Sequence, residues 1–130
     1  MAYDWLLGTR VRDVLDGMGG AAELQMMGAL CFLRRGHICC GVSGDRLMVR
    51  LGADGAVAAL RDPLVAPLGI GGGRAPKGFV TVAPEGVADP DALAACVARG
   101  VAFADALPEK LSAANRRNKR LIRHGADGRG

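Results

Sequence analysis

Aromatic residues make up only 4% of this 130-residue sequence, so a core must be built from aliphatic side chains and methionine. No apolar run approaches the roughly 20 residues that a membrane-spanning helix requires. No basic segment precedes an apolar stretch at the start, which argues against a signal peptide. Half of the residues are apolar, enough for one domain that needs neither metal nor disulfides. We therefore expect a cytoplasmic protein that has no membrane contact.

The four cysteines, Cys31, Cys39, Cys40 and Cys96, lack the spacing of a metal centre, and no CxxC pair occurs. Strand alternation would send Cys39 and Cys40 to opposite faces, where they cannot easily bind one ion. His37 would lie about 6–7 Å along the strand from Cys39, too far to activate its thiol. We expect reduced thiols, with Cys31 and Cys40 buried and Cys39 partly exposed, and we assign no metal, cofactor or catalytic residue.

The glycine-rich stretch at 69–78 lacks the pattern of a phosphate-binding loop. A P-loop needs Gly-Lys-Ser/Thr leading into a helix, whereas Lys77 is followed by Gly78 and a predicted strand. No paired carboxylates stand in the strand region, so the sequence offers no acid–base chemistry. The residues therefore indicate a protein that is not an enzyme.

What the sequence does contain is a change from helical to strand periodicity. Apolar residues at intervals of three and four predict helices over 4–17, 53–61 and 90–106. Alternating patterns predict strands over 23–34, 37–43, 46–51 and 78–83, with a further short strand near 64–68. The stretch at 23–34 reads as one bent strand or two short ones, because Gly28 interrupts it. The predicted fold class is α+β, with two layers: an antiparallel meander sheet and flanking helices.

Two-residue turns at 35–36 and 44–45 fix the expected register of the meander. The predicted cross-strand pairs are Leu33 with Ile38, Cys31 with Cys40, Val42 with Leu47 and Cys40 with Val49. The core face that follows comprises Cys31, Leu33, Ile38, Cys40, Val42, Leu47, Val49 and Leu51.

The opposite face of the meander is mixed in character. It is expected to carry Leu30, Phe32 and Met48 beside several arginines. Apolar side chains rimmed by arginine are typical of an interaction patch, although scattered surface hydrophobes give the same pattern. We expect this face to bind an unidentified protein partner or a second copy of the chain.

The positive charge is confined to the C-terminal end. Residues 1–109 carry 10 Lys and Arg against 12 Asp and Glu, whereas residues 110–130 carry 7 against 1. The sequence therefore predicts a domain at 1–109 and a basic, disordered tail at 110–130. Such a tail can be a solubilising end, contact an acidic protein, or contact nucleic acid weakly through counterion release. The residues assigned to nucleic-acid contact are Arg116, Arg117, Lys119, Arg120 and Arg123.

Several segments together suggest a family. They are MMGALCF (26–32), GHICCGV (36–42), DRLMVR (45–50) and KGFVTV (77–82). In order and spacing the chain resembles the N-terminal domain family of TfoX/Sxy, bacterial regulators linked to competence genes, over about residues 1–110. The family often has MFGG where this chain has MMGA at 26–29, and its full-length regulators carry a second helical domain where only the tail stands here.

The resemblance implies a small two-layer α+β domain with no established catalytic residues. Our leading hypothesis is a bacterial, cytoplasmic, non-enzymatic interaction or regulatory module, linked to competence or transcription. The alternative is a nucleic-acid-associated protein that acts through the basic tail. A second alternative is an enzyme with a cysteine nucleophile.

Overall fold

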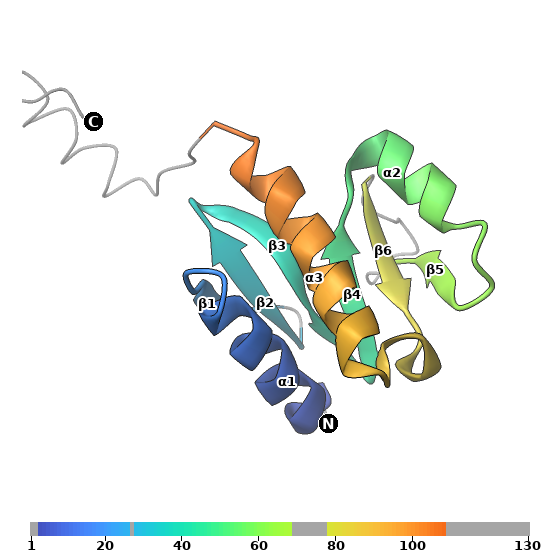
Figure 1. Ribbon diagram of the computed structural model, residues 1–130, viewed down its shortest axis with the longest axis horizontal. Coiled ribbons are helices and arrows are strands. Elements are labelled where there is room, and N and C mark those ends of the chain that lie inside the picture. The colour runs from blue at the N-terminus through green and yellow to red at the C-terminus, as the bar shows by residue number, and fades with distance from the viewer. Residues whose placement is uncertain (1–2, 27, 69–77, 109–130) are drawn as a thin grey trace, which may run out of the picture.

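The computed structural model describes residues 3–26, 28–68 and 78–108. These residues fold into three α-helices, one short 3₁₀ helix and one six-stranded sheet (Figure 1). The helices are α1 (Trp5–Asp16), α2 (Gly52–Ala59), η1 (Pro84–Val87) and α3 (Pro90–Asp105). The strands are β1 (Ala22–Met26), β2 (Ala29–Arg34), β3 (His37–Ser43), β4 (Arg46–Arg50), β5 (Val65–Pro67) and β6 (Phe79–Val82). Each helix and strand predicted from periodicity is present, and η1 is an additional element.

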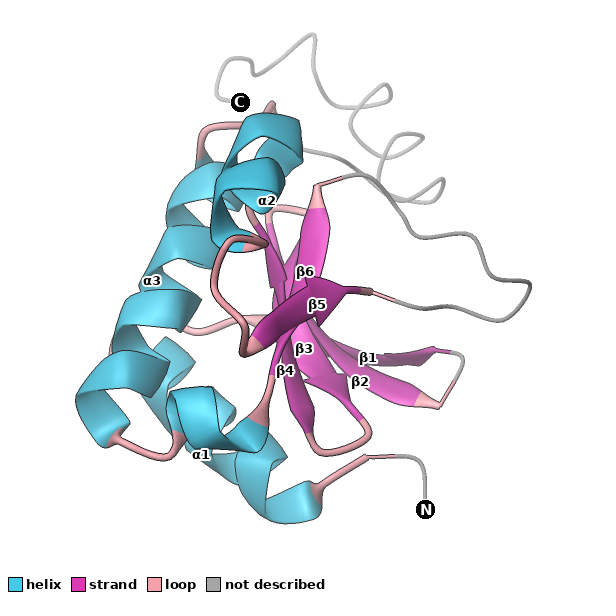
Figure 2. Cartoon of the chain, turned by 90° about the vertical axis from the view of Figure 1, so that its right-hand side faces the viewer, coloured by secondary structure: helices cyan, strands magenta, loops and turns pink. Residues whose placement is uncertain are grey.

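The sheet is antiparallel throughout, in the order β1-β2-β3-β4-β6-β5. All three α-helices lie on one face of it, so the domain has two layers (Figure 2). This arrangement confirms the predicted α+β fold. The predicted strand at 23–34 is a hairpin, because Gly28 adopts a positive φ of 80° at the turn between β1 and β2. In the described part of the chain, no helix has the length and apolar character to cross a membrane.

Helix starts follow from local chemistry. The Asp4 carboxylate accepts hydrogen bonds from the backbone N–H groups of Leu6 and Leu7, at 2.9 and 3.3 Å. Asp89 caps α3 in the same way, and Pro90 occupies the first helical position. Such caps satisfy N–H groups that have no partner within the helix. The apolar side of each long helix then packs against the sheet.

The register confirms three of the four predicted pairs and corrects the fourth. Leu33 lies opposite Ile38, but Cys31 lies opposite Gly41 and not opposite Cys40. The register shifts between Phe32 and Leu33, so β3 carries one extra residue. A bulge of this kind inverts which side of one strand faces the core. The predicted core face is therefore wrong for Cys31 and Leu33 on β2 and for Ile38 on β3, which lie on the opposite side of the sheet.

The inversion places Leu30 and Phe32 in the core beneath the helices, at 3% and 1% exposure. Phe32 lies opposite Cys40, and Leu30 lies opposite Val42. Phe32 is among the largest fully buried side chains in the domain. The expectation that Leu30 and Phe32 lie on an uncovered face is therefore wrong.

Arg34, at the end of β2, joins the two long helices to the sheet. Its guanidinium donates to both carboxylate oxygens of Asp105 on α3, at 3.2 and 2.8 Å. It also donates to the carbonyl oxygens of Met18 and Gly20, just after α1, both at 2.9 Å. One side chain thus binds the C-terminal ends of α1 and α3, where the carbonyls carry partial negative charge.

Candidate interaction surface

The sheet face that points away from the helices carries a second, smaller apolar cluster. Cys31, Met48 and Leu68 form its buried centre. Ala29, Leu33, Ile38 and Phe79 pack around that centre and are partly buried. We call this side of the sheet the open face. Leu24 pairs with Cys31 and Met26 pairs with Ala29, so both side chains of β1 extend the open face outward.

Met48 lies on the open face, as expected, but it is buried. A Cβ at Gly41 would overlap the terminal methyl of Met48, at 2.6 Å. The missing side chain therefore leaves the room in which Met48 lies over β3, beside Cys31. Met48 is 4% exposed and fills the centre of the cluster. Of the three interaction residues predicted from the sequence, the structure brings only Met48 to this face.

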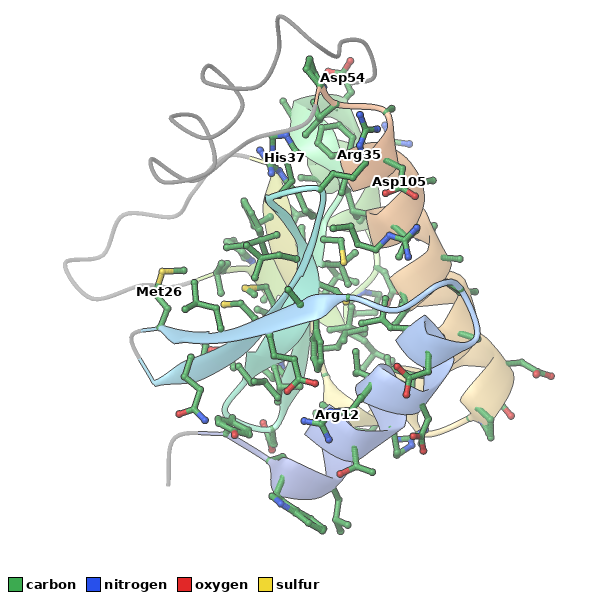
Figure 3. All side chains as sticks on the ribbon, turned by 90° about the vertical axis from the view of Figure 1, so that its left-hand side faces the viewer. Arg12, Met26, Arg35, His37, Asp54 and Asp105 are labelled. Atoms are coloured by element: carbon green, nitrogen blue, oxygen red, sulfur yellow. The ribbon has the colours of Figure 1, made fainter. Side chains whose placement is uncertain are left out.

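The most accessible apolar side chains of the open face belong to β1. All five residues of this strand are exposed. Leu24 and Met26 retain 46% and 39% of their accessible surface. Figure 3 shows Met26 at the outer end of the strand, pointing away from the body of the domain. Sequence reasoning did not single out these two residues, although the alternation of AELQM between glycines at 20 and 28 marks a half-polar strand.

The other side of β1 is polar and held by α1. The Arg12 guanidinium donates to both oxygens of Glu23, at 2.5 and 2.8 Å. Gln25 lies 3.4 Å from the hydroxyl of Tyr3. The hydrogen bond to Arg12 lowers the pKa of Glu23 below its ordinary value. These contacts fix β1 against α1 while its apolar side chains stay exposed.

A second exposed apolar pair lies at the first turn of α1. Trp5 and Leu6 are 67% and 65% exposed. They border a shallow depression whose other walls are Tyr3, Asp4, Gly44 and Asp45. A hydrogen bond of 2.7 Å from the Asp4 N–H to the Gly44 carbonyl oxygen joins two of these lining residues. The depression is wide and open, without a buried polar group to orient a ligand.

The cysteines are arranged differently from the sequence prediction. Because of the bulge, Cys39 and Cys40 both lie in the core on the helix side, each at 0% exposure, with sulfur atoms 3.8 Å apart. Cys39 is therefore not partly exposed. The Cys39 thiol also donates to the carbonyl oxygen of Phe32, at 3.5 Å. All four cysteines are free thiols.

Burial keeps most of these thiols protonated. It raises the pKa of Cys31 and of Cys96 above the ordinary value. The pKa of Cys40 is raised further, first by its hydrogen bond with Cys39 and then by burial. The same hydrogen bond, and then the charge of Arg34, lowers the pKa of Cys39, but that thiol has no access to solvent. A nucleophilic cysteine needs a thiolate that a substrate can reach.

A small cavity of about 90 Å³ lies between α2, α3 and the sheet. Its walls are mainly apolar but include Asp62, Cys96 and Arg99, and it has room for a few water molecules. His37, which the sequence places near the cysteines, donates a 2.6 Å hydrogen bond from Nε2 to the carbonyl oxygen of Pro108. Within the ranges that the structure describes, no three His, Cys, Asp or Glu side chains converge as metal ligands would.

The predicted nucleic-acid residues at 116–123 lie outside the described residues, as does most of the glycine-rich stretch at 69–78. At the end of the described chain, Arg35 donates to the carbonyl of Asp105, at 2.7 Å. Figure 3 shows Arg35, His37 and Asp105 together at this end of the domain.

Comparison with known proteins confirms the resemblance seen in the sequence. The family model of the TfoX N-terminal domain matches residues 13–104, which is more than half of the chain. The protein belongs to the TfoX N-terminal domain family. No curated protein and no solved structure matches the chain.

Proposed function

We propose that this protein is a non-enzymatic interaction module that binds a protein through the open face and the adjoining strand β1. The observation that carries the proposal is the exposure of Leu24 and Met26 at the margin of an apolar cluster. Exposed apolar side chains that continue a buried cluster are typical of a docking surface, because a partner removes them from water.

Membership of the TfoX N-terminal domain family supports a proposal for the biological setting. We propose a bacterial, cytoplasmic regulator in which the domain acts by association, with a link to competence or transcription. The buried and protonated thiols support the non-enzymatic proposal over the alternative of a cysteine nucleophile.

The test compares two pairs of substitutions in the full chain. Leu24→Ser with Met26→Ser reduces the apolar character of the open face at β1, where both side chains are exposed. Val57→Ser with Leu60→Ser makes the same chemical change on or beside α2, at exposed positions. Tagged protein is used to capture bound proteins, including differently tagged copies of itself.

We expect the open-face pair to lose the captured protein and the α2 pair to retain it. Thermal melting of both variants shows whether a loss of captured protein comes from a lost contact or from unfolding. Retention of every captured protein by a folded open-face variant would contradict the proposal.

A second candidate function is nucleic-acid association through the tail. The observation that favours it is the charge distribution, because residues 110–130 carry 7 basic side chains and 1 acidic one. Polycations bind phosphate backbones without sequence preference.

A further inference from the structure

The two edges of the sheet are unequal. One edge is β5, which has three residues and contains Pro67, a residue with no backbone N–H to donate. The other edge is β1, with five residues, all of them exposed. Proteins usually protect an edge strand with proline, lysine, a bulge or a covering segment. β1 contains no proline, lysine or bulge, and its only charge, on Glu23, is bound by Arg12.

We propose that β1 pairs antiparallel with β1 of a second copy, about a twofold axis that passes beside Leu24. The proposal rests on the proposed function, since it names the partner of that same surface as this chain itself. Backbone N–H and C=O groups on the free side of β1 would then bond to their equivalents, as in strand addition. The sheet would run continuously through both copies.

The sequence of β1 is self-complementary only in this register. A twofold axis normal to the sheet keeps the open faces of the two copies on the same side. Residues opposite each other must then point to the same side of the sheet, so one residue of the strand lies opposite its own counterpart at the axis. Centring on Leu24 pairs all five residues, with Ala22 opposite Met26, Glu23 opposite Gln25 and Leu24 opposite its counterpart. Apolar groups then face apolar groups on the open face, and a carboxylate faces an amide on the helix side.

The other registers are less favourable. Centring on Glu23 sets two Arg12–Glu23 ion pairs directly opposite each other and pairs only three residues. Centring on Gln25 also pairs only three residues and leaves Ala22 and Glu23 beyond the contact. Because Arg12 neutralises Glu23, the register centred on Leu24 brings no uncompensated charge into the contact.

The pairing also accounts for the exposed side chains. Leu24, at 46% exposure, would meet its counterpart at the axis, and Met26 would lie over Ala22 of the second copy. Each copy would thereby cover apolar surface of the other on the open face, beside the cluster that contains Cys31. Contacts at the centre of an interface contribute most to affinity, so Leu24 is the residue to change.

The experiment measures the oligomeric state of the full chain by analytical ultracentrifugation over a range of concentrations. The variants are Leu24→Glu, Leu24→Lys and the matched control Val57→Glu, which changes an exposed residue of α2. We expect the wild type and the control to dimerise equally. Each Leu24 variant should dimerise at least tenfold more weakly, because like charges meet at the axis.

Mixing Leu24→Glu with Leu24→Lys should restore a one-to-one dimer, since opposite charges then face each other. The restoration also shows that both variants are folded. Hydrogen exchange gives an independent measurement: amides at 22–26 should gain protection as concentration rises, whereas those of Val65 and Ala66 on β5 should not.

A wild type that stays monomeric at all concentrations would overturn the pairing, as would a dimer that Leu24→Glu leaves intact. A monomer that binds a different protein through β1 would also overturn it. That last result would leave the proposed function standing, because the capture experiment reports on any protein bound at the open face.

Discussion

Gly100 on α3 lies directly against the backbone carbonyl of Cys39 on β3, so close that a Cβ at position 100 would overlap the oxygen. Val49 on β4 also limits the space at this point, because one of its methyl groups lies 3.2 Å from where a Cβ of residue 100 would be. Cys39 is the residue that the bulge adds to β3. The helix and the bulge therefore fit together only because position 100 has no side chain.

Replacing Gly100 with alanine should destabilise the domain by about 1–3 kcal/mol, because the helix must move away from the sheet. Helix propensity alone would give the opposite sign, a gain of up to about 1 kcal/mol. Urea unfolding measures the difference. Gly17→Ala is the control, since a Cβ there meets its nearest neighbour at an ordinary 3.4 Å. An equally stable Gly100→Ala variant would show that α3 does not depend on this contact.

Phe32 should behave as a core residue. Phe32→Ala should lower the free energy of unfolding by about 3–5 kcal/mol, because it leaves a cavity beneath the helices. Leu24→Ala, at a half-exposed position, should cost less than about 1 kcal/mol. Chemical denaturation compares the two. A stable Phe32→Ala protein with altered self-association would favour the opposite placement of β2.

The ion pair between Arg34 and Asp105 should make stability fall in acid. The hydrogen bond from Arg34 lowers the pKa of Asp105 below its ordinary 3.8. A lowered folded-state pKa means that the stabilisation is complete above 3.8 and disappears as the pH falls through the folded value. Asp105→Asn should therefore be less stable than wild type at neutral pH, and the gap should close below pH 3.8. A gap that is independent of pH would contradict this assignment.

Thiol labelling should distinguish Cys96 from the other cysteines. Cys31, Cys39 and Cys40 are at most 3% exposed, whereas Cys96 is partly accessible and lines the cavity. We expect native protein to label slowly at Cys96 alone, and all four thiols to label in denaturant. Because burial raises the pKa of Cys96, its labelling rate should still be increasing at pH 9, the ordinary value. Rapid native labelling of Cys39 would place the bulge elsewhere.

The basic tail should carry any affinity for polyanions. Replacing the five basic residues between 116 and 123 with glutamine should abolish low-salt retention on DNA. The melting temperature should stay nearly unchanged, because few large apolar side chains lie beyond residue 109. The control replaces Arg61 and Arg99, two exposed arginines of the domain, and should keep wild-type retention. If the tail variant is retained like wild type, the DNA contact lies in the domain.

Periodicity and turn chemistry were sufficient to predict the elements. The turn at Arg35 and Gly36 has positive φ at both residues, 55° and 85°, as a tight hairpin requires. That turn correctly pairs Leu33 with Ile38. Family resemblance and charge distribution were equally visible in the sequence.

The bulge at Cys39 could not be read in the same way. In the common type of bulge the extra residue has backbone angles near those of a helix, which any residue can adopt. The sequence therefore needs no glycine or proline at that position, and nothing in it marks the bulge. A single inserted residue then exchanged the two sides of β2 and moved Phe32 from the predicted interaction face into the core. The exposure of β1 was also hidden, because which hairpin strand becomes an edge depends on the order of the whole sheet.

The shortness of β5 and its proline bear on how far assembly can go. A protein with two unprotected edge strands can add further copies at both edges without limit, and such open-ended assembly leads to fibres. Within the described residues, β1 is the edge strand that lacks such protection, and Pro67 lies at the opposite edge of the sheet. In the proposed dimer, contact through β1 would occupy that strand in both molecules, and the described sheet would offer no second edge of the same kind for further growth.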